Sequence, residues 1–216
     1  MNSFNVSLVM IVALVLGSAV AYFPDYAAVS TKTPVAERLP LPALGQIPRS
    51  PSRMSIEEAY ASLERPRTKF DARQATMSVN EREYLVLMFA ILDVATVARV
   101  EAGSELSQGL SAAENVAVLD RLTRFACSFD APPALRPYHR HVVDALARQE
   151  KFFSDWQRDG KAFEFATPET MRENEDLQTA SRAIKRAYDE LMTLYRDEGE
   201  HNRSAFAGYC AAIDVL

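Results

Sequence analysis

A run of hydrophobic positions from Tyr84 to Val100 stands out in the interior of the chain. Its first nine residues carry no charge, so a helix placed here has no polar face to present to water. Such a helix belongs inside a packed protein. We therefore expect this run to form the central helix of the fold, with Asp93 and Arg99 as its only charged interruptions.

Three later segments carry apolar residues on one side only. Spacings of three and four predict helices over about 112–129, over about 134–159 and from Pro168 onward. Gln149 interrupts the second stripe, and the third has the heptad-like spacing of bundle packing. The stripes are Val118, Leu119, Leu122, Phe125, Ala126 and Phe129, then Leu135, Tyr138, Val142, Ala145, Phe152 and Trp156, then Leu177, Ala180, Ile184, Ala187, Leu191 and Leu194.

Capping boxes mark three expected helix starts. In each, a serine is followed three residues later by a glutamate that can bond back to the N–H of the serine. They predict a short helix over 55–64, the central helix over about 79–107, with Gly103 as its weak point, and the helix from 112; residues 66–77 should be an irregular link. The pairs are Ser55 and Glu58, Ser78 and Glu81, and Ser111 and Glu114.

The predicted fold class is all-α. We expect a bundle of four to five helices around a central apolar helix, over residues 55–216, because no segment shows the alternation of a strand. Before it we expect an N-terminal hydrophobic segment over 1–23 and a Pro-rich linker over 24–54. The linker has six prolines in 31 residues, which prevents regular structure, and is either a plain spacer or a strap along a partner.

The hydrophobic segment from Phe4 to Phe23 has twenty residues without a charge, which is about 30 Å as a helix and enough to cross a bilayer. One interpretation is a signal peptide cleaved after Ala21. The other is a retained anchor, with aromatic residues at both interfaces. No Lys or Arg precedes the segment, so membrane orientation stays open, although Lys32 and Arg38 slightly favour a cytoplasmic position for the residues after it. We expect export, with the domain periplasmic or extracellular.

Charge divides the chain unevenly. Residues 1–54 have a net charge of +2. The whole chain has a net charge of −5, so the remaining residues have a net charge of −7. An acidic domain without a basic run argues against nucleic-acid binding, which needs clustered Lys and Arg. With 216 residues, the chain suits one domain with extensions.

The most suggestive metal-ligand spacing is Glu198-x-x-His201. If the last helix continues through these residues, both side chains face the bundle interior, as in carboxylate-bridged di-iron bundles. Such sites need a second Glu-x-x-His motif, and the chain has only three histidines. His139 and His141 flank the stripe of another helix, where the segment from Tyr138 to His141 more simply closes the bundle end. The alternative is that Gly199 ends or loosens the helix, so that Glu198, Glu200 and His201 are solvated or locally paired. Glu198 and His201 are therefore weak metal candidates.

Asp93 and the two cysteines complete the candidates. A buried Asp93 must be paired or protonated. It is either a proton-active or ligand-binding group with a raised pKa, or it lies at an exposed edge or pairs with an arginine such as Arg140 or Arg186. Cys127 and Cys210 show no metal or haem spacing. They are either small buried side chains or a disulfide.

No nucleophile elbow, phosphate-binding glycine loop or dinucleotide fingerprint is present. The leading hypothesis is therefore a non-catalytic interaction or accessory protein that is exported or membrane-tethered through residues 4–23. It would dock on a protein partner, a membrane complex or itself, without a cofactor. The alternative is a small metal- or cofactor-binding bundle that uses Glu198 and His201. A secreted enzyme with a site assembled across helices is a third possibility.

Overall fold

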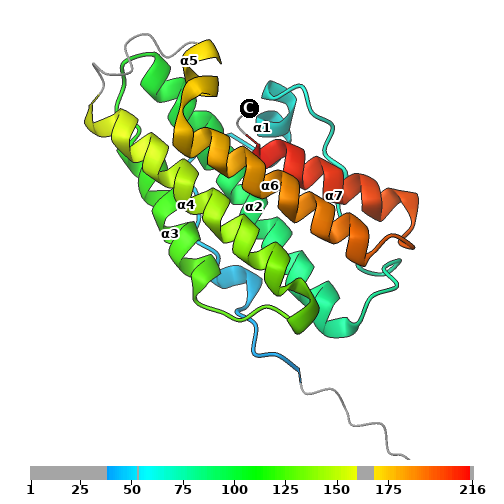
Figure 1. Cartoon of the computed structure of the whole chain (residues 1–216). Coiled ribbons are helices and arrows are strands. Elements are labelled where there is room, and N and C mark those ends of the chain that lie inside the picture. The colour runs from blue at the N-terminus through cyan, green and yellow to red at the C-terminus, as the bar shows by residue number, and fades with distance from the viewer. Residues whose placement is uncertain (1–37, 53, 160–167, 215–216) are drawn as a thin grey trace, which may run out of the picture. The chain divides into compact units, whose positions relative to one another are not determined.

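The structure is a computed structural model that describes residues 38–52, 54–159 and 168–214. Residues 1–37, which include the expected signal peptide or anchor, lie outside the described residues. The described part contains α-helices, two 3-10 helices and no strand, which confirms the all-α prediction (Figure 1). The elements are η1 (Leu44–Gln46), α1 (Ile56–Ser62), α2 (Val79–Ser107), α3 (Ala113–Cys127), η2 (Pro133–Leu135), α4 (Arg136–Arg158), α5 (Pro168–Glu173), α6 (Glu175–Leu194) and α7 (Glu200–Ile213).

Local signals set both ends of α2. At its start, the Ser78 N–H donates to the Glu81 carboxylate over 2.9 Å, and the Glu81 N–H donates back to the Ser78 hydroxyl. At its end, Gly109 adopts a φ of 71°, and the next N–H reaches back to the carbonyl of Glu105 over 2.9 Å. Glycine suits this left-handed position because it has no Cβ to clash. The helix runs through Gly103 without a break.

Two of the three predicted capping boxes are confirmed, at Ser55 and Ser78. The third prediction was wrong, because α3 begins at Ala113 and Ala112 occupies the N-cap position without a side-chain cap. The Ala112 N–H instead donates to the Gln157 side chain of α4 over 2.6 Å. A contact between helices therefore replaces the cap that the local sequence assigned to Ser111.

Helix α2 lies against α1, α3, α4 and α7, while α4 runs beside α3 and α6, and α6 beside α7 (Figure 1). Fourteen residues of α2 are buried, among them Leu92 and Asp93. The stripe of α4 is buried as predicted, including Phe152 and Trp156. Among the described helices, none combines the length and the apolar character that crossing a bilayer requires.

The helix predicted from Pro168 onward is divided into α5, α6 and α7. The seam therefore does not continue through Glu198 and His201, in agreement with the interpretation that the helix ends or loosens near Gly199. Asn174 caps the start of α6 by accepting the Leu177 N–H over 3.1 Å. Helix α6 ends at Leu194, which is 43% exposed, and a turn comes next. Gly199 has an extended backbone before α7 begins. The turn brings α7 against both α6 and α2.

Residues 38–52, which we call the strap, belong to the compact unit of residues 38–216. The linker boundary expected near residue 55 therefore lies inside this unit. Leu41 and Ile47 pack against the hydrophobic core, and Arg38 pairs with Glu83 of α2 over 3.2 Å. The strap runs along α3 in the opposite direction, since it begins next to the end of α3 and reaches Asn115, near its start, through Ser50.

Candidate functional site

Asp93 is buried in α2 and holds a small polar cluster together. Its carboxylate accepts hydrogen bonds from Arg67 Nε over 3.1 Å, from an Arg67 terminal nitrogen over 2.5 Å and from the Tyr60 hydroxyl over 3.1 Å. Arg67 also pairs with Glu57 at 2.9 Å. The partners suggested by the sequence, Arg140 and Arg186, are wrong, because the cation comes from the irregular link before α2.

Burial raises the pKa of the Asp93 carboxyl, against the opposing effects of Arg67 and Tyr60. Burial and the neighbouring carboxylate likewise raise the pKa of the Tyr60 phenol. The guanidinium carbon of Arg67 lies 5.7 Å from the centre of the Tyr60 ring, in the range of a cation–π contact. Every oxygen of Asp93 is thus used in joining α1 and the link to α2, which is a structural role.

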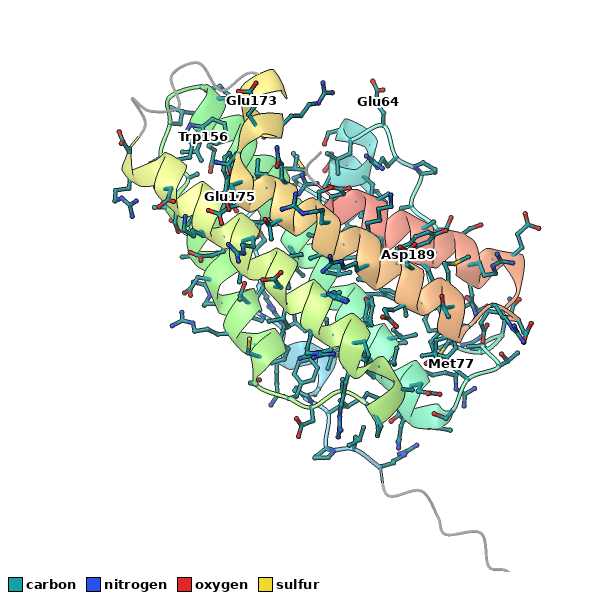
Figure 2. The ribbon with its side chains drawn as sticks, viewed as in Figure 1. Glu64, Met77, Trp156, Glu173, Glu175 and Asp189 are labelled. Carbon is teal, nitrogen blue, oxygen red and sulfur yellow. The ribbon has the colours of Figure 1, made fainter. Side chains whose placement is uncertain are left out.

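Glu198 lies in the turn between α6 and α7, is 5% exposed and bonds the link to that turn. One carboxylate oxygen accepts from both the N–H and the hydroxyl of Thr76, each over 2.6 Å, and the other accepts from the Asn202 amide over 3.2 Å. Met77, next along the link, is labelled beside this turn in Figure 2. Burial raises the pKa of Glu198, but the bonds from Thr76 and Asn202 outweigh it and leave the pKa below its usual value.

Glu198→Gln should lower the free energy of unfolding by about 1–3 kcal/mol at pH 7, because an amide cannot accept all these donors. Since the folded pKa lies below the unfolded one, the carboxylate stabilises the fold above a pH of about 4.3, the usual glutamate pKa. This stabilisation is lost as the pH falls through the folded pKa. Urea titrations between pH 7 and pH 3 should therefore show the wild type and the variant converging. Glu190→Gln, at an exposed position of α6, serves as the control, and parallel curves would contradict the assignment.

His201 does not join Glu198 in a shared site. It is exposed, and its Nε2 lies 2.9 Å from the carbonyl oxygen of Lys69. Across the residues that the structure describes, no group of three or more His, Cys, Asp and Glu side chains is placed to hold a metal ion. Glu198 thus lies in the loop before α7, whereas His201 lies in the first helical turn of α7. Each side chain contacts a different part of the link, Glu198 at Thr76 and His201 at Lys69.

The two cysteines are free thiols in different surroundings. Cys127 is exposed at the end of α3, whereas Cys210 is buried in α7, where burial raises its thiol pKa to about 12. The expectation of two buried side chains therefore holds for Cys210 only.

Iodoacetamide should modify only Cys127 in the folded protein, because alkylation requires an accessible thiolate. Cys210 should react only after unfolding in urea. Intact-mass spectra taken with and without reductant should give the same mass, because neither cysteine is in a disulfide. Equal rates of modification at both residues, or a bonded form, would contradict the structure.

Two buried polar side chains hold the end of α7. Arg99 of α2 donates to the carbonyl of Ala212 over 2.5 Å, and Gln149 of α4 donates to the carbonyl of Ile213 over 2.6 Å. The last carbonyls of a helix lack partners within it, so these contacts act as a cap. Burial lowers the pKa of Arg99 to about 10. The contact with Ile213 explains why Gln149, a polar residue, interrupts the apolar stripe of α4.

His139 lies at the end of the bundle where α3 connects to α4. Its Nδ1 is 2.8 Å from the hydroxyl of Tyr84 at the start of α2, and its ring packs against Phe129 with centroids 5.9 Å apart. Burial lowers the pKa of the imidazole, which the nearby Asp130 partly opposes. These contacts hold His139 in place while it lines an adjacent cavity.

This cavity, which we call the corner cavity, has a volume of about 480 Å³. The loop after α3 and the first turns of α4 form its walls. Arg136 and Arg140 are exposed there and make no ion pair with any residue that the structure describes. The lining residues are Phe129, Asp130, Ala131, Pro133, Arg136, Pro137, His139 and Arg140.

A second cavity of about 260 Å³ adjoins the first and shares Phe129 and Asp130 with it. Its other walls come from the strap, through Leu39, Pro40 and Pro42, and from the end of α3, through Cys127 and Ser128. The two cavities together form the candidate site, because charged side chains and the aromatic ring of Phe129 line them. The sequence indicated only that polar rings were dense between Tyr138 and His141. It did not indicate the strap or the loop that complete the walls.

The comparisons add no relative from which a role could be transferred. No protein-family model, no curated protein and no solved structure matches this chain.

Proposed function

We propose that the chain is a non-catalytic helical interaction domain that is exported or tethered to a membrane and docks on a partner protein. The observation that carries this proposal is the candidate site at the strap end of the bundle. There, Arg136 and Arg140 have no ion-pair partner among the described residues and border open space, together with an apolar wall. Surfaces of this kind are typical of recognition sites, in which arginine and aromatic residues are enriched.

A non-catalytic role is supported by the use of the buried polar groups. Asp93 and Glu198 are engaged in joining the link to α2 and to the turn before α7. Arg99 and Gln149 hold the end of α7. Catalysis would require some such group to face a substrate-sized space with a matched partner, and each of these side chains makes at least one bond within the fold.

The tether is supported by the sequence before the strap. The segment from Phe4 to Phe23 is long and apolar enough for a signal peptide or an anchor. The strap then enters the domain beside the candidate site. We regard α2 as the central helix of this domain, since it contacts α1, α3, α4 and α7 and has fourteen buried residues.

The proposal can be tested with the full chain in its native host cells. A photo-crosslinking amino acid at Ala134, an exposed position beside the corner cavity, should capture a protein in the membrane or exported fraction. The same amino acid at Glu190, exposed on α6, is the control and should capture little. Intact-mass measurement would report cleavage after Ala21. A cytoplasmic monomer without a cross-link from Ala134 would overturn the proposal.

A further inference from the structure

Arg136 and Arg140 lie one helical turn apart on α4. Like charges at this spacing repel each other, so the pair gains nothing from its own arrangement. The other two arginines of α4 are neutralised, Arg148 by Asp144 and Asp176, and Arg158 by Asp155. Two adjacent guanidinium groups without internal partners offer planar forks that match a carboxylate.

Beside the two arginines, Asp130 and His139, the corner cavity has an apolar wall. Phe129, Ala131, Pro133 and Pro137 form this wall, and the aromatic ring is fixed by its contacts with Tyr84 and Phe125. A small inorganic anion would leave the apolar wall without a contact. A ligand that uses the whole cavity has an anionic group and an apolar group close together.

Asp130 narrows the choice of ligand. It lines both cavities and places a negative charge near His139. That charge favours a peptide, because a carboxylate can accept a hydrogen bond from a backbone N–H.

The shape also favours a chain-like ligand. The walls of the corner cavity and of the second cavity share Phe129 and Asp130, so the two cavities lie next to each other. The strap contributes Leu39, Pro40 and Pro42 to the second cavity, and Phe129 gives both cavities an aromatic residue, as in grooves that bind extended peptides. A segment that runs from one hollow to the other would contact both.

We infer that these two neighbouring cavities bind an acidic, extended peptide segment of the partner. A carboxylate of that segment is held by Arg136 and Arg140, a neighbouring apolar side chain packs on Phe129 and Pro133, and a backbone N–H donates to Asp130. The inference rests on the proposed function and names the chemistry of the partner.

The test uses random peptides displayed on phage and selected on the full chain in detergent micelles. The selected peptides should be enriched in Asp or Glu next to an apolar residue. A fluorescent copy of one peptide should bind the Arg136→Gln/Arg140→Gln variant about tenfold or more weakly than the wild type, since both forks are lost. The matched control is Arg182→Gln/Arg186→Gln, which removes two exposed arginines with the same spacing from α6 and should change affinity less than about twofold.

Peptides without acidic residues, or equal binding by the Arg136→Gln/Arg140→Gln variant with an unchanged melting temperature, would overturn the inference. Binding of inorganic phosphate or phosphatidylglycerol vesicles through these arginines, without peptide binding, would overturn it in favour of a phosphate ligand. Cross-links from Ala134 with no acidic peptide selected would remove this inference and leave the proposed function standing. Acidic peptides bound through Arg136 and Arg140, with no cross-link in cells, would support the peptide-binding site and contradict the proposed docking on a partner in cells.

Discussion

Replacing Arg67 with alanine should lower the free energy of unfolding by about 3–5 kcal/mol at pH 7, because it leaves the Asp93 carboxylate buried without its cation. In the folded protein, the side chains of Arg67 and Asp93 are only 12% and 8% exposed, so water cannot replace the lost partner. Chemical denaturation followed by circular dichroism would measure the change. Arg38→Ala removes an exposed ion pair with Glu83 and should cost no more than about 1 kcal/mol.

The pH dependence gives this prediction a second readout. Burial raises the pKa of Asp93, so the folded state holds its proton more tightly than the unfolded state. The contribution of Asp93 therefore favours folding in acid and declines as the pH rises through the folded pKa. Loss of Arg67 raises that pKa further, and the deficit of the variant should shrink at low pH. Adding Asp93→Asn should recover part of the stability at pH 7, and a double variant no more stable than Arg67→Ala would contradict the pairing.

Leu92→Ala in α2 should lower the free energy of unfolding by about 2–5 kcal/mol, since it opens a space in the core where the side chain is fully buried. Leu110→Ala is the matched control, because Leu110 is 57% exposed just after the same helix. It should change stability by less than about 0.5 kcal/mol. Equal effects at the two positions would show that Leu92 is not enclosed.

Those features of the fold that depend on near neighbours could be predicted from the sequence. The caps at Ser55 and Ser78 are such features, because a serine and a glutamate three residues later need only each other. The stripe of α4 is another, since a helix turns its apolar positions to one side wherever it packs. At Ser111 the same local signal failed, because Gln157 of another helix satisfies the Ala112 N–H.

The features that could not be predicted depend on contacts between distant segments. Gly199 indicated that the helix ends nearby, but not that Glu198 bonds there to Thr76, which lies 122 positions away. The partner of Asp93 was misassigned because Arg67 lies in a link without periodicity, and one sequence cannot say where such a link passes. Only the part of the candidate site that lies on α4 could be predicted, for the same reason. Arg136 and His139 belong to one helix, whereas the strap wall comes from the other end of the sequence.

The packing of α7 against α2 has a consequence for the newly made chain. The ribosome completes α2 at Ser107, but α7 begins only at Glu200. Throughout the synthesis of the intervening residues, the side of α2 that α7 will cover lacks its native partner. Contacts of such long sequence separation slow folding and expose apolar surface during it. The emerging chain should therefore depend on a holding chaperone until α7 has left the ribosome.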